Sequence, residues 1–199
     1  MPEGPEIRRI SDKLSKVLVH KKLVWYSFPY LEKNYKNIND FNYIKNITSR
    51  GKSILIRLDN DYTIYSHCQL YGKWTINLTK TKLKTNRSLR LEFITNNHHI
   101  RLWSATDINL IRTTDENNHP FLKKLGIDIL DSKTDYNIIF KTLISKKCYK
   151  RKAATIMLDQ SAFGGLGNYL RSEILYNAKI HPENRPCDLS NEALIKWAA

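Results

Sequence analysis

The sequence predicts an α+β fold in which an N-terminal helix and a β-sandwich are followed by a helical region. Three observations predict it: apolar residues recur at helical spacing near the start, short β-type runs occupy residues 22–112, and helical spacing returns after residue 120. The polar segment 113–120 ends in a proline, so we interpret it as a linker. We therefore expect two domains, 1–115 and 116–199.

The first expected element is an amphipathic helix over residues 3–20. Its apolar positions follow the helical repeat, with basic residues between them: Ile7, Ile10, Leu14, Val17 and Leu18 are apolar, and Arg8, Arg9, Lys13 and Lys16 are basic. One face of this helix is therefore expected to pack on a core while the opposite face stays in water.

Short runs of β-type residues follow the helix. They are Leu23–Phe28, Ser53–Leu58, Tyr62–His67, Lys73–Asn77, Leu89–Ile94, Ile100–Trp103 and Ile108–Ile111. Turn-forming stretches such as Asp59-Asn60-Asp61 and Asn96-Asn97 separate neighbouring runs, which favours antiparallel pairing. A sandwich or a small barrel is the expected outcome.

Helical segments are expected beyond the linker. They cover Pro120–Leu125, Thr134–Ser145, Ala153–Gln160, Tyr169–Tyr176 and the stretch from Ser190 to Ala199, which Ser190-Asn191-Glu192 opens. The apolar face of the last segment stops at Ala199, before a helix of usual length is complete. We therefore expect the chain to be cut short.

The charge of the chain indicates a polyanionic partner. Lys and Arg number 33 against 19 Asp and Glu, which gives a net charge of +14 and a pI near 9.7. Nucleic acid is the first candidate and a membrane surface the alternative. No run of about 18 apolar residues exists, and the N-terminus lacks the order of a signal peptide. We expect a protein of the cytoplasm or nucleoid.

The cysteines and histidines predict neither a disulfide framework nor a metal site. Cys68, Cys148 and Cys187 are few and scattered, and no Cys-x-x-Cys pair offers zinc-ligand spacing. Neighbours such as His67 and Cys68 point to opposite faces of a strand, which favours structural roles. We predict reduced thiols, no metal ligands and no cofactor in this chain.

The N-terminus carries the residues of a covalent catalyst. Removal of Met1 would make Pro2 a free secondary amine, which can attack an electrophilic carbon and form an iminium ion. With a pKa near ~8, roughly a tenth of an α-amino group is neutral at pH 7, and Glu3 beside it could manage protons. The alternative interpretation is a helix start, with Pro5 in the first turn and Glu3 and Glu6 at the positive end of the helix dipole.

Ordered blocks along nearly the whole chain resemble one enzyme family. They are Met1-Pro2-Glu3-Gly4-Pro5-Glu6-Ile7-Arg8-Arg9, Arg50-Gly51-Lys52, Tyr65-Ser66-His67-Cys68-Gln69-Leu70-Tyr71-Gly72, His119-Pro120-Phe121-Leu122, Leu158-Asp159-Gln160 and Gly165-Leu166-Gly167-Asn168-Tyr169-Leu170-Arg171. Together they resemble the DNA glycosylase/lyases typified by formamidopyrimidine-DNA glycosylase and endonuclease VIII. The opening is similar to the endonuclease VIII branch, because the other branch usually has a bulkier residue at the position of Gly4.

The resemblance implies a fold, a partner and an activity. The implied fold is an N-terminal helix on a β-sandwich, joined to a helix-two-turn-helix domain, with DNA bound between the two. The implied partner is double-stranded DNA with a damaged base or an abasic site, bound by a monomer. The implied activity is removal of oxidised pyrimidines in base excision repair, followed by strand cleavage through β- or β,δ-elimination.

The resemblance also assigns catalytic roles. Pro2 corresponds to the nucleophile that displaces the damaged base and forms the iminium with the opened sugar. Glu3 corresponds to the residue that shuttles protons during glycosidic cleavage and ring opening. Lys52 corresponds to a proton donor whose cation also stabilises developing negative charge. Taken alone, a lysine after Arg-Gly is usually a solvated turn residue, so the role of Lys52 depends on its place among the other blocks.

DNA contacts are implied at further positions. A flipped nucleotide leaves a hole in the duplex, which the resemblance fills with Gln69, Leu70 and Tyr71. The alternative is a hairpin tip with one buried aromatic residue. Asn168 is expected to cap a helix whose N-terminus binds phosphate, unless it belongs to an ordinary capped helix. Lys124 matches a basic DNA-contacting position, although it could equally lie on the wet face of a helix.

One part of the family pattern has no counterpart in these residues. The family usually continues into a β-hairpin finger held by four cysteines on zinc, which supplies an arginine to the phosphate at the lesion. We therefore expect an incomplete helix-two-turn-helix domain without the zinc finger. The alternative function is a non-catalytic DNA-binding remnant of such an enzyme.

Overall fold

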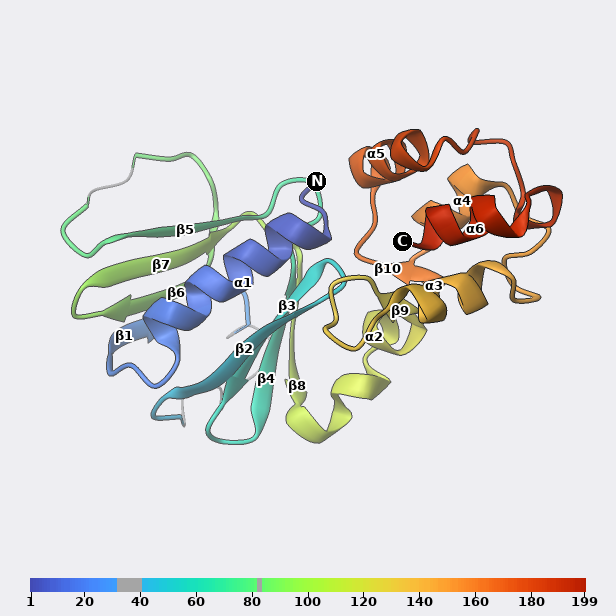
Figure 1. Ribbon diagram of the computed structural model, residues 1–199. Helices are drawn as coiled ribbons and strands as arrows, with labels where there is room; N and C mark the ends of the chain where they lie inside the picture. The colour runs from blue at the N-terminus through green and yellow to red at the C-terminus, as the bar shows by residue number, and fades with distance from the viewer. Residues whose placement is uncertain (32–40, 82–83) are drawn as a thin grey trace. The chain divides into compact units, whose positions relative to one another are not determined.

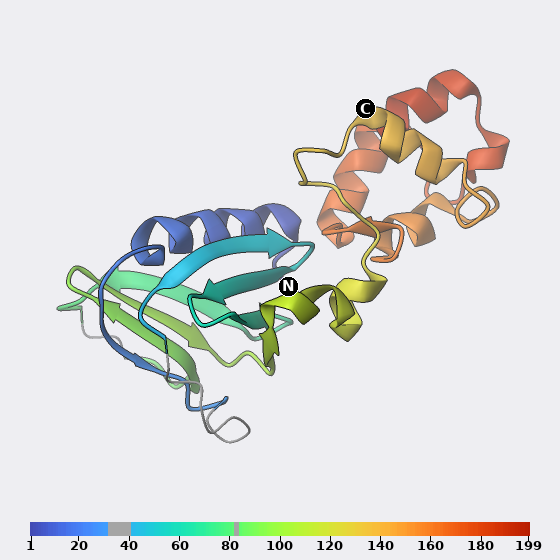
Figure 2. The same cartoon turned by 90° about the horizontal axis from the view of Figure 1, so that it is seen from below.

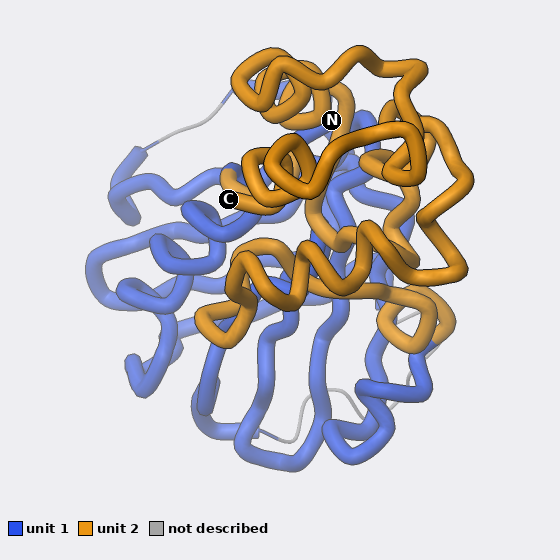
Figure 3. Tube along the Cα trace, turned by 45° about the vertical axis from the view of Figure 1, so that its right-hand side comes forward, with its two compact units in different colours: residues 1–2, 6–119 blue, residues 3–5, 120–199 orange. Residues whose placement is uncertain are grey.

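The computed structural model describes residues 1–31, 41–81 and 84–199, which divide into two compact units (Figure 3). Unit 1 holds residues 1–2 and 6–119, and unit 2 holds residues 3–5 and 120–199. Residues 3–5 therefore belong to the same unit as residues 120–199, although they are far from them in the sequence. In the described ranges, no helix has both the length and the apolar character needed to cross a membrane.

Unit 1 contains two four-stranded antiparallel sheets (Figure 1). The strands are β1 (Leu23–Ser27), β2 (Ile44–Arg50), β3 (Ser53–Leu58), β4 (Tyr62–His67), β5 (Lys73–Leu78), β6 (Leu89–Thr95), β7 (His98–Trp103) and β8 (Asp107–Arg112). One sheet has the order β1-β6-β7-β5 and the other β2-β3-β4-β8. The expected sandwich is confirmed, and the predicted strands lie within about one or two residues of their observed ends.

Strand β2 is absent from the sequence prediction. Its buried residues Ile44 and Ile47 are three positions apart, because the pairing with β3 shifts register between Ile44 and Asn46. A bulge of this kind breaks the strict alternation by which a half-buried strand is recognised in a sequence.

Helix α1 (Gly4–Leu18) covers the core of unit 1 as its amphipathic pattern predicts. Ile7, Leu14 and Leu18 are at most 1% exposed and join the cluster that both sheets contribute to. Figures 1 and 2 both show α1 beside β2, and Val19 forms a parallel bridge with Ile44 just after the helix. The helix thereby closes one side of the sandwich core.

The expected linker begins with a 3₁₀ helix, η1 (Thr113–Asn118). Its Glu116 accepts two hydrogen bonds from the guanidinium of Arg57, both at 2.7 Å, and one from Thr63 at 2.7 Å. Glu116 is 8% exposed, so this charge is paired inside unit 1. The first part of the segment is consequently attached to the sandwich rather than being an open connection.

Unit 2 is helical apart from one short pair of parallel strands. Its elements are α2 (Pro120–Lys124), β9 (Ile127–Asp128), α3 (Tyr136–Leu143), α4 (Ala153–Leu158), β10 (Phe163–Gly164), α5 (Asn168–Ala178), the 3₁₀ helix η2 (Pro186–Asp188) and α6 (Asn191–Ala198). All expected helices are confirmed, and Ser190 caps α6 by accepting a hydrogen bond from the Ala193 backbone. Leu194 and Trp197 of α6 are buried in the core of this unit.

Candidate active-site residues in the two units

Glu3 lies at the N-terminus of α5 within unit 2. It is 5% exposed, and its two carboxylate oxygens accept the backbone N–H groups of Tyr169 and Leu170 at 3.0 and 3.2 Å. These first-turn N–H groups have no acceptor inside their own helix, and the positive end of the helix dipole favours a carboxylate there. The helix-start interpretation holds for α1 as regards Pro5 and Glu6, which lie in its first turn. The Glu3 carboxylate instead lies at the start of α5.

Asn168 does not cap α5, contrary to the sequence prediction. The N-cap is Gly167, which makes no side-chain cap bond, and Asn168 is the first helical residue. Glu3 supplies the acceptor that a capping side chain would otherwise provide. A Cβ on Gly167 would lie 2.2 Å from Cδ of Glu3, so any larger residue there requires the Glu3 carboxyl group to move.

The anion site expected at this helix is therefore partly occupied by the protein itself. Two of the N–H groups expected to bind phosphate donate to Glu3. The side chain of Asn168 is exposed, which leaves it accessible from solvent at the start of α5. Any phosphate contact at this end of unit 2 must use that side chain rather than the backbone of Tyr169 and Leu170.

Lys52 lies in the tight turn between β2 and β3 of unit 1. Gly51 has a φ of +59°, a conformation that glycine adopts at low cost, and Arg50 pairs with Ser53 across the turn. Ser53 also pairs with His67 on β4, which brings the turn next to that histidine. Lys52 is half-buried, so it is not simply a solvated turn residue.

His67, which the sequence analysis expected to be structural, contacts the backbone of Gln69 and lies near the charge of Lys52. Its pKa lies below the ordinary value because burial disfavours the charged ring; Asp107 opposes this effect, and the nearby charge of Lys52 adds to it. Its Nδ1 accepts the backbone N–H of Gln69 at 3.1 Å, so the neutral ring carries its proton on Nε2. The sequence signal was its position two residues before Gln69.

The segment Gln69-Leu70-Tyr71 lies in the connection from β4 to β5, which crosses from one sheet to the other. Leu70 is 67% exposed and Tyr71 is 72% exposed. A hairpin tip with a buried aromatic residue is therefore wrong. Exposed apolar side chains at a fixed position are the arrangement that an intercalating wedge requires.

Three contacts fix the shape of this connection. The Thr106 hydroxyl donates to Oε1 of Gln69 at 2.6 Å, and Nη1 of Arg87 donates to the Tyr71 carbonyl at 2.6 Å. The Gly72 backbone donates to the Cys68 carbonyl at 2.7 Å, where a Cβ on residue 72 would meet that oxygen at 2.4 Å. The connection thus presents Leu70 and Tyr71 on a backbone that is held at both ends.

Pro2 and Lys124 complete the predicted set. Pro2 is half-buried and belongs to unit 1, and its nitrogen is part of the peptide bond with Met1 in the sequence as written. It becomes an amine only when Met1 is removed. Lys124 is the last residue of α2 in unit 2 and its side chain is exposed. Unit 1 thus brings Lys52 and Gln69 together around His67, and unit 2 brings Glu3 to the helix of Asn168.

The residues present do not fit the zinc site that the resemblance implies for the family. Cys68, Cys148 and Cys187 are free thiols, and burial raises the pKa of Cys68 to about 11. Across residues 1–31, 41–81 and 84–199, no three potential ligands of the His, Cys, Asp or Glu type come together.

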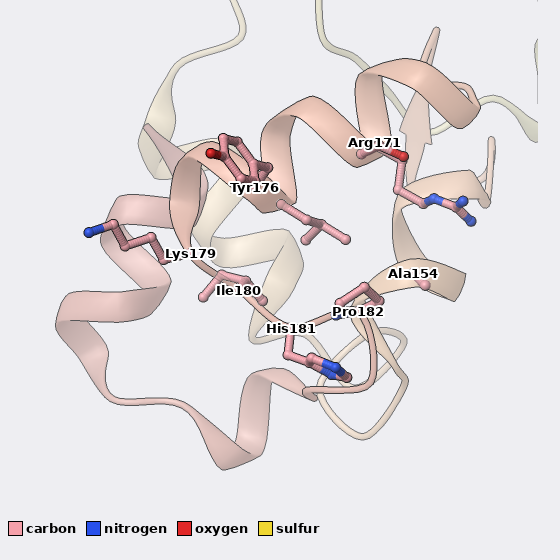
Figure 4. A pocket seen from close by; sticks show the side chains of 9 residues that line it. Ala154, Arg171, Tyr176, Lys179, Ile180, His181 and Pro182 are labelled. Carbon is pink, nitrogen blue, oxygen red and sulfur yellow. The ribbon is translucent and has the colours of Figure 1, made fainter.

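Unit 2 also has a cavity of about 620 Å³ beside α5 (Figure 4). Leu175, Ile180 and Pro182 give it an apolar lining, and Arg171, Lys179 and His181 are also among the lining residues. No predicted site residue lines it. Its lining does not include Glu3 or the two residues whose N–H groups bind Glu3.

Sequence comparison finds matches over both units. Residues 1–107 match the formamidopyrimidine-DNA glycosylase N-terminal domain, and residues 125–197 match the formamidopyrimidine-DNA glycosylase H2TH domain. Proteins named Endonuclease 8 from Pectobacterium carotovorum and Escherichia coli are each 39% identical, over 98% and 96% of this chain. The chain spans 74% and 73% of their respective lengths.

Solved structures show the same fold. A Lactococcus lactis Fpg in complex with abasic-site DNA has a TM-score of 0.80 at 23% identity, covering 98% of this chain and 74% of that one. A second Lactococcus lactis Fpg complex, with DNA containing an oxidised pyrimidine, has the same TM-score and identity and covers 99% of this chain and 76% of that one. Both support the α+β fold with a helical second unit.

Proposed function

Because the chain belongs to the formamidopyrimidine-DNA glycosylase and endonuclease VIII family, we propose that it removes oxidised pyrimidines from double-stranded DNA and cleaves the strand at the resulting abasic site. Enzymes of this family are DNA glycosylases with AP lyase activity that act in base excision repair. The relatives named Endonuclease 8 and the Pro2-Glu3-Gly4 opening favour the pyrimidine-directed branch.

The observation that carries the proposal is the anchored carboxylate of Glu3. It follows the prospective nucleophile Pro2 by one peptide bond and is held by two N–H donors at the start of α5. An acid–base group is effective when its position is fixed relative to the reacting atoms. A polar side chain at the N-cap position, residue 167, could cap α5 locally, so capping alone does not require a carboxylate from the distant residue 3.

In the proposed reaction, the nitrogen of Pro2 forms a bond to the sugar carbon that bears the damaged base. The bond from that carbon to the base breaks, the base leaves with the bonding electrons and takes a proton, and Glu3 moves protons as the sugar ring opens. The resulting iminium acidifies the neighbouring carbon, so loss of its proton expels the 3′ phosphate. Lys52, whose charge also acts on His67, supplies the proton donor and a cation near developing negative charge.

Recognition of DNA is assigned to exposed groups in each unit. The target nucleotide must leave the stack, and Leu70 and Tyr71 would fill the space while the Gln69 amide meets the unpaired base. Lys124 and the Asn168 side chain would contact phosphates. We propose that the enzyme acts as a monomer in the cytoplasm or nucleoid and needs no cofactor, and that domains 1–115 and 116–199 both contribute contacts to DNA.

Borohydride trapping tests the function. Protein shown by mass spectrometry to lack Met1 is incubated with duplex DNA containing an abasic site, and borohydride is added to reduce the iminium to a stable amine. We expect a covalent protein–DNA band on a denaturing gel, and no band from protein whose N-terminal amine is acetylated. DNA binding without a band from the unblocked protein would support the alternative, a non-catalytic DNA-binding remnant.

A further inference from the structure

We propose that Gln160 is a positioning residue for Glu3, an inference that rests on the proposed function. Gln160 ends the block Leu158-Asp159-Gln160, to which the proposed reaction gives no role. It does not contact Glu3 or any reacting group. It acts through the loop of residues 161–167, which connects α4 to α5.

The side chain of Gln160 closes this loop upon itself. Its Nε2 donates to the Leu166 carbonyl at 2.8 Å, and its Oε1 accepts the Gly165 backbone N–H at 3.2 Å. A primary amide can make both contacts at once, because it carries a donor and an acceptor on the same planar group. One side chain therefore satisfies two neighbouring peptide groups that lack a strand partner on that side.

The main chain of Gln160 fixes the same loop to the rest of unit 2. Its carbonyl accepts the Gly126 N–H at 2.9 Å, next to the parallel pairing of β9 with β10. A Cβ on Gly126 would lie 2.5 Å from the carbonyl oxygens of Ser161 and Ala162. The backbone of residues 160–162 is thus closely packed against Gly126, which fixes the position from which the Gln160 side chain extends.

The closed loop in turn holds the residues at the N-terminus of the chain. The Gly165 carbonyl accepts the backbone N–H of Gly4 at 2.8 Å, while its own N–H is the one bound to Gln160. Gly165 has a φ of +95°, and a Cβ on Gly4 would lie 3.2 Å from its Cα, so the two glycines are in close contact. Displacement of Gly165 therefore displaces Gly4 and the adjacent Glu3.

The far end of the loop delivers the other contact to Glu3. After Leu166 and Gly167, the chain enters α5, whose first-turn N–H groups bind the Glu3 carboxylate. Gln160 thereby holds Glu3 at two points. One is the Glu3 backbone, through the neighbouring residue Gly4, and the other is the Glu3 carboxylate, through the start of α5. Both contacts to Glu3 depend on the loop of residues 161–167, and the Gln160 amide is the side chain that bonds to the backbone of this loop.

The test uses the full chain with two substitutions and a matched control. Gln160→Ala removes both amide contacts, whereas Gln160→Glu keeps the size and the acceptor but removes the donor to Leu166. Asn184→Ala is the control, because Asn184 is also a partly buried amide of unit 2 and its Oδ1 accepts the His181 N–H at 3.0 Å, away from the loop. Each protein is assayed for single-turnover base excision, borohydride trapping on a preformed abasic site, DNA affinity and thermal unfolding.

Both Gln160 variants should lose about 10- to 100-fold in the rate of base excision, since a misplacement near 1 Å can reduce catalysis by about that much. Trapping on abasic DNA should stay within about threefold of wild type, because that substrate has already lost its base and its sugar opens to the aldehyde without help from Glu3. DNA affinity should not change. A general loss of structure would lower excision and trapping together, so the split between them reports positioning.

The proposal is overturned if both Gln160 variants excise the base as fast as the Asn184 control, or if excision and trapping fall in parallel with the melting temperature. If Gln160→Ala does not fold, Gln160→Glu alone decides between these outcomes. Wild-type protein that neither excises nor traps would remove the proposed function and this inference with it. If the wild-type protein is active and the Gln160 variants are unaffected, only the positioning role of Gln160 is contradicted.

Discussion

At the scale of single residues, the site depends on small groups that allow Glu3 to approach α5. Gly167 is the clearest of them, because the space for its Cβ is already taken by the Glu3 carboxyl group. The backbone at Gly167 is extended, so alanine there is excluded by contact with Glu3 and not by an unusual φ. Glycine is therefore required at residue 167 because of the space that Glu3 occupies and not because of the backbone conformation.

Gly167→Ala should therefore displace Glu3 and reduce base excision by at least about tenfold. The measurement is the single-turnover excision rate together with thermal unfolding. Asn177→Ala, at an exposed position of the same helix, is the control and should leave the rate within about twofold of wild type. An unchanged rate in Gly167→Ala would show that the position of Glu3 does not control the reaction.

Asp159 gives a residue-scale prediction about pH. Burial raises its pKa, but hydrogen bonds from Ser161 and Arg151 outweigh that effect and hold the pKa at about 2, below the ordinary 3.8. A carboxyl group with a lowered pKa in the folded state contributes stability above its unfolded pKa and loses it as the pH falls through the folded value. The loss from this group is thus expected between about pH 4 and pH 2.

Asp159→Asn should flatten the pH dependence of stability in that window. The free energy of unfolding in urea is measured from pH 6 down to pH 2. The difference between wild type and variant should be constant above about pH 4 and should shrink between about pH 4 and pH 2. A difference that stays constant with pH would mean that Asp159 ionisation does not stabilise the start of the loop.

At the scale of elements, the connection between β4 and β5 has a backbone that is held by hydrogen bonds and two side chains that are exposed. Contacts from Thr106 and Arg87 hold its backbone, while its two apolar side chains remain in water. Exposed side chains contribute little to folding, so substitutions there separate binding from stability.

Leu70→Ala and Tyr71→Ala should each weaken binding to lesion-containing duplex DNA by about 5- to 30-fold, the range expected from losing one stacking or wedge contact of about 1–2 kcal/mol. Fluorescence anisotropy gives the affinity, and melting temperatures should stay within about 2 °C of wild type. Leu78→Ala is matched to them, because Leu78 is 66% exposed in the same unit but lies at the end of β5. Equal loss in Leu78→Ala would contradict a specific role for the connection.

Most elements could be predicted from the sequence because their own residues determine them. The helix α1 and the strands other than β2 follow hydrophobic periodicity, whereas the bulge in β2 hides its alternation. The Asn168 cap was wrong for a different reason. Its acceptor comes from Glu3, far away in the sequence, and local capping rules contain no information about such a contact.

The predicted site residues show the same division. Leu70 and Tyr71 are exposed as their proposed role requires, and His67, which was expected to be structural, binds the backbone of Gln69. The position of His67 two residues before Gln69 is visible in the sequence, but it does not predict that hydrogen bond. Motif position identifies which residues matter, and three-dimensional contacts identify what holds them.

At the scale of the whole molecule, the net charge of +14 predicts strongly salt-dependent DNA binding. Each phosphate contact made by a basic residue adds about 0.9 to the slope of log affinity against log salt. Lys124→Ala should reduce this slope by about one and weaken binding equally for damaged and undamaged duplexes. Lys45→Ala is the control, since Lys45 pairs with Asp61 at 3.4 Å, and its slope should match wild type.

The account as a whole depends on the amine of Pro2 as the atom that bonds to the sugar. The most direct measurement is tandem mass spectrometry of the borohydride-trapped complex after digestion of protein and DNA. The account predicts that the added sugar mass lies on the N-terminal residue of the peptide that begins Pro2-Glu3-Gly4. Attachment to Lys52, or to any other lysine with Pro2 unmodified, would contradict it.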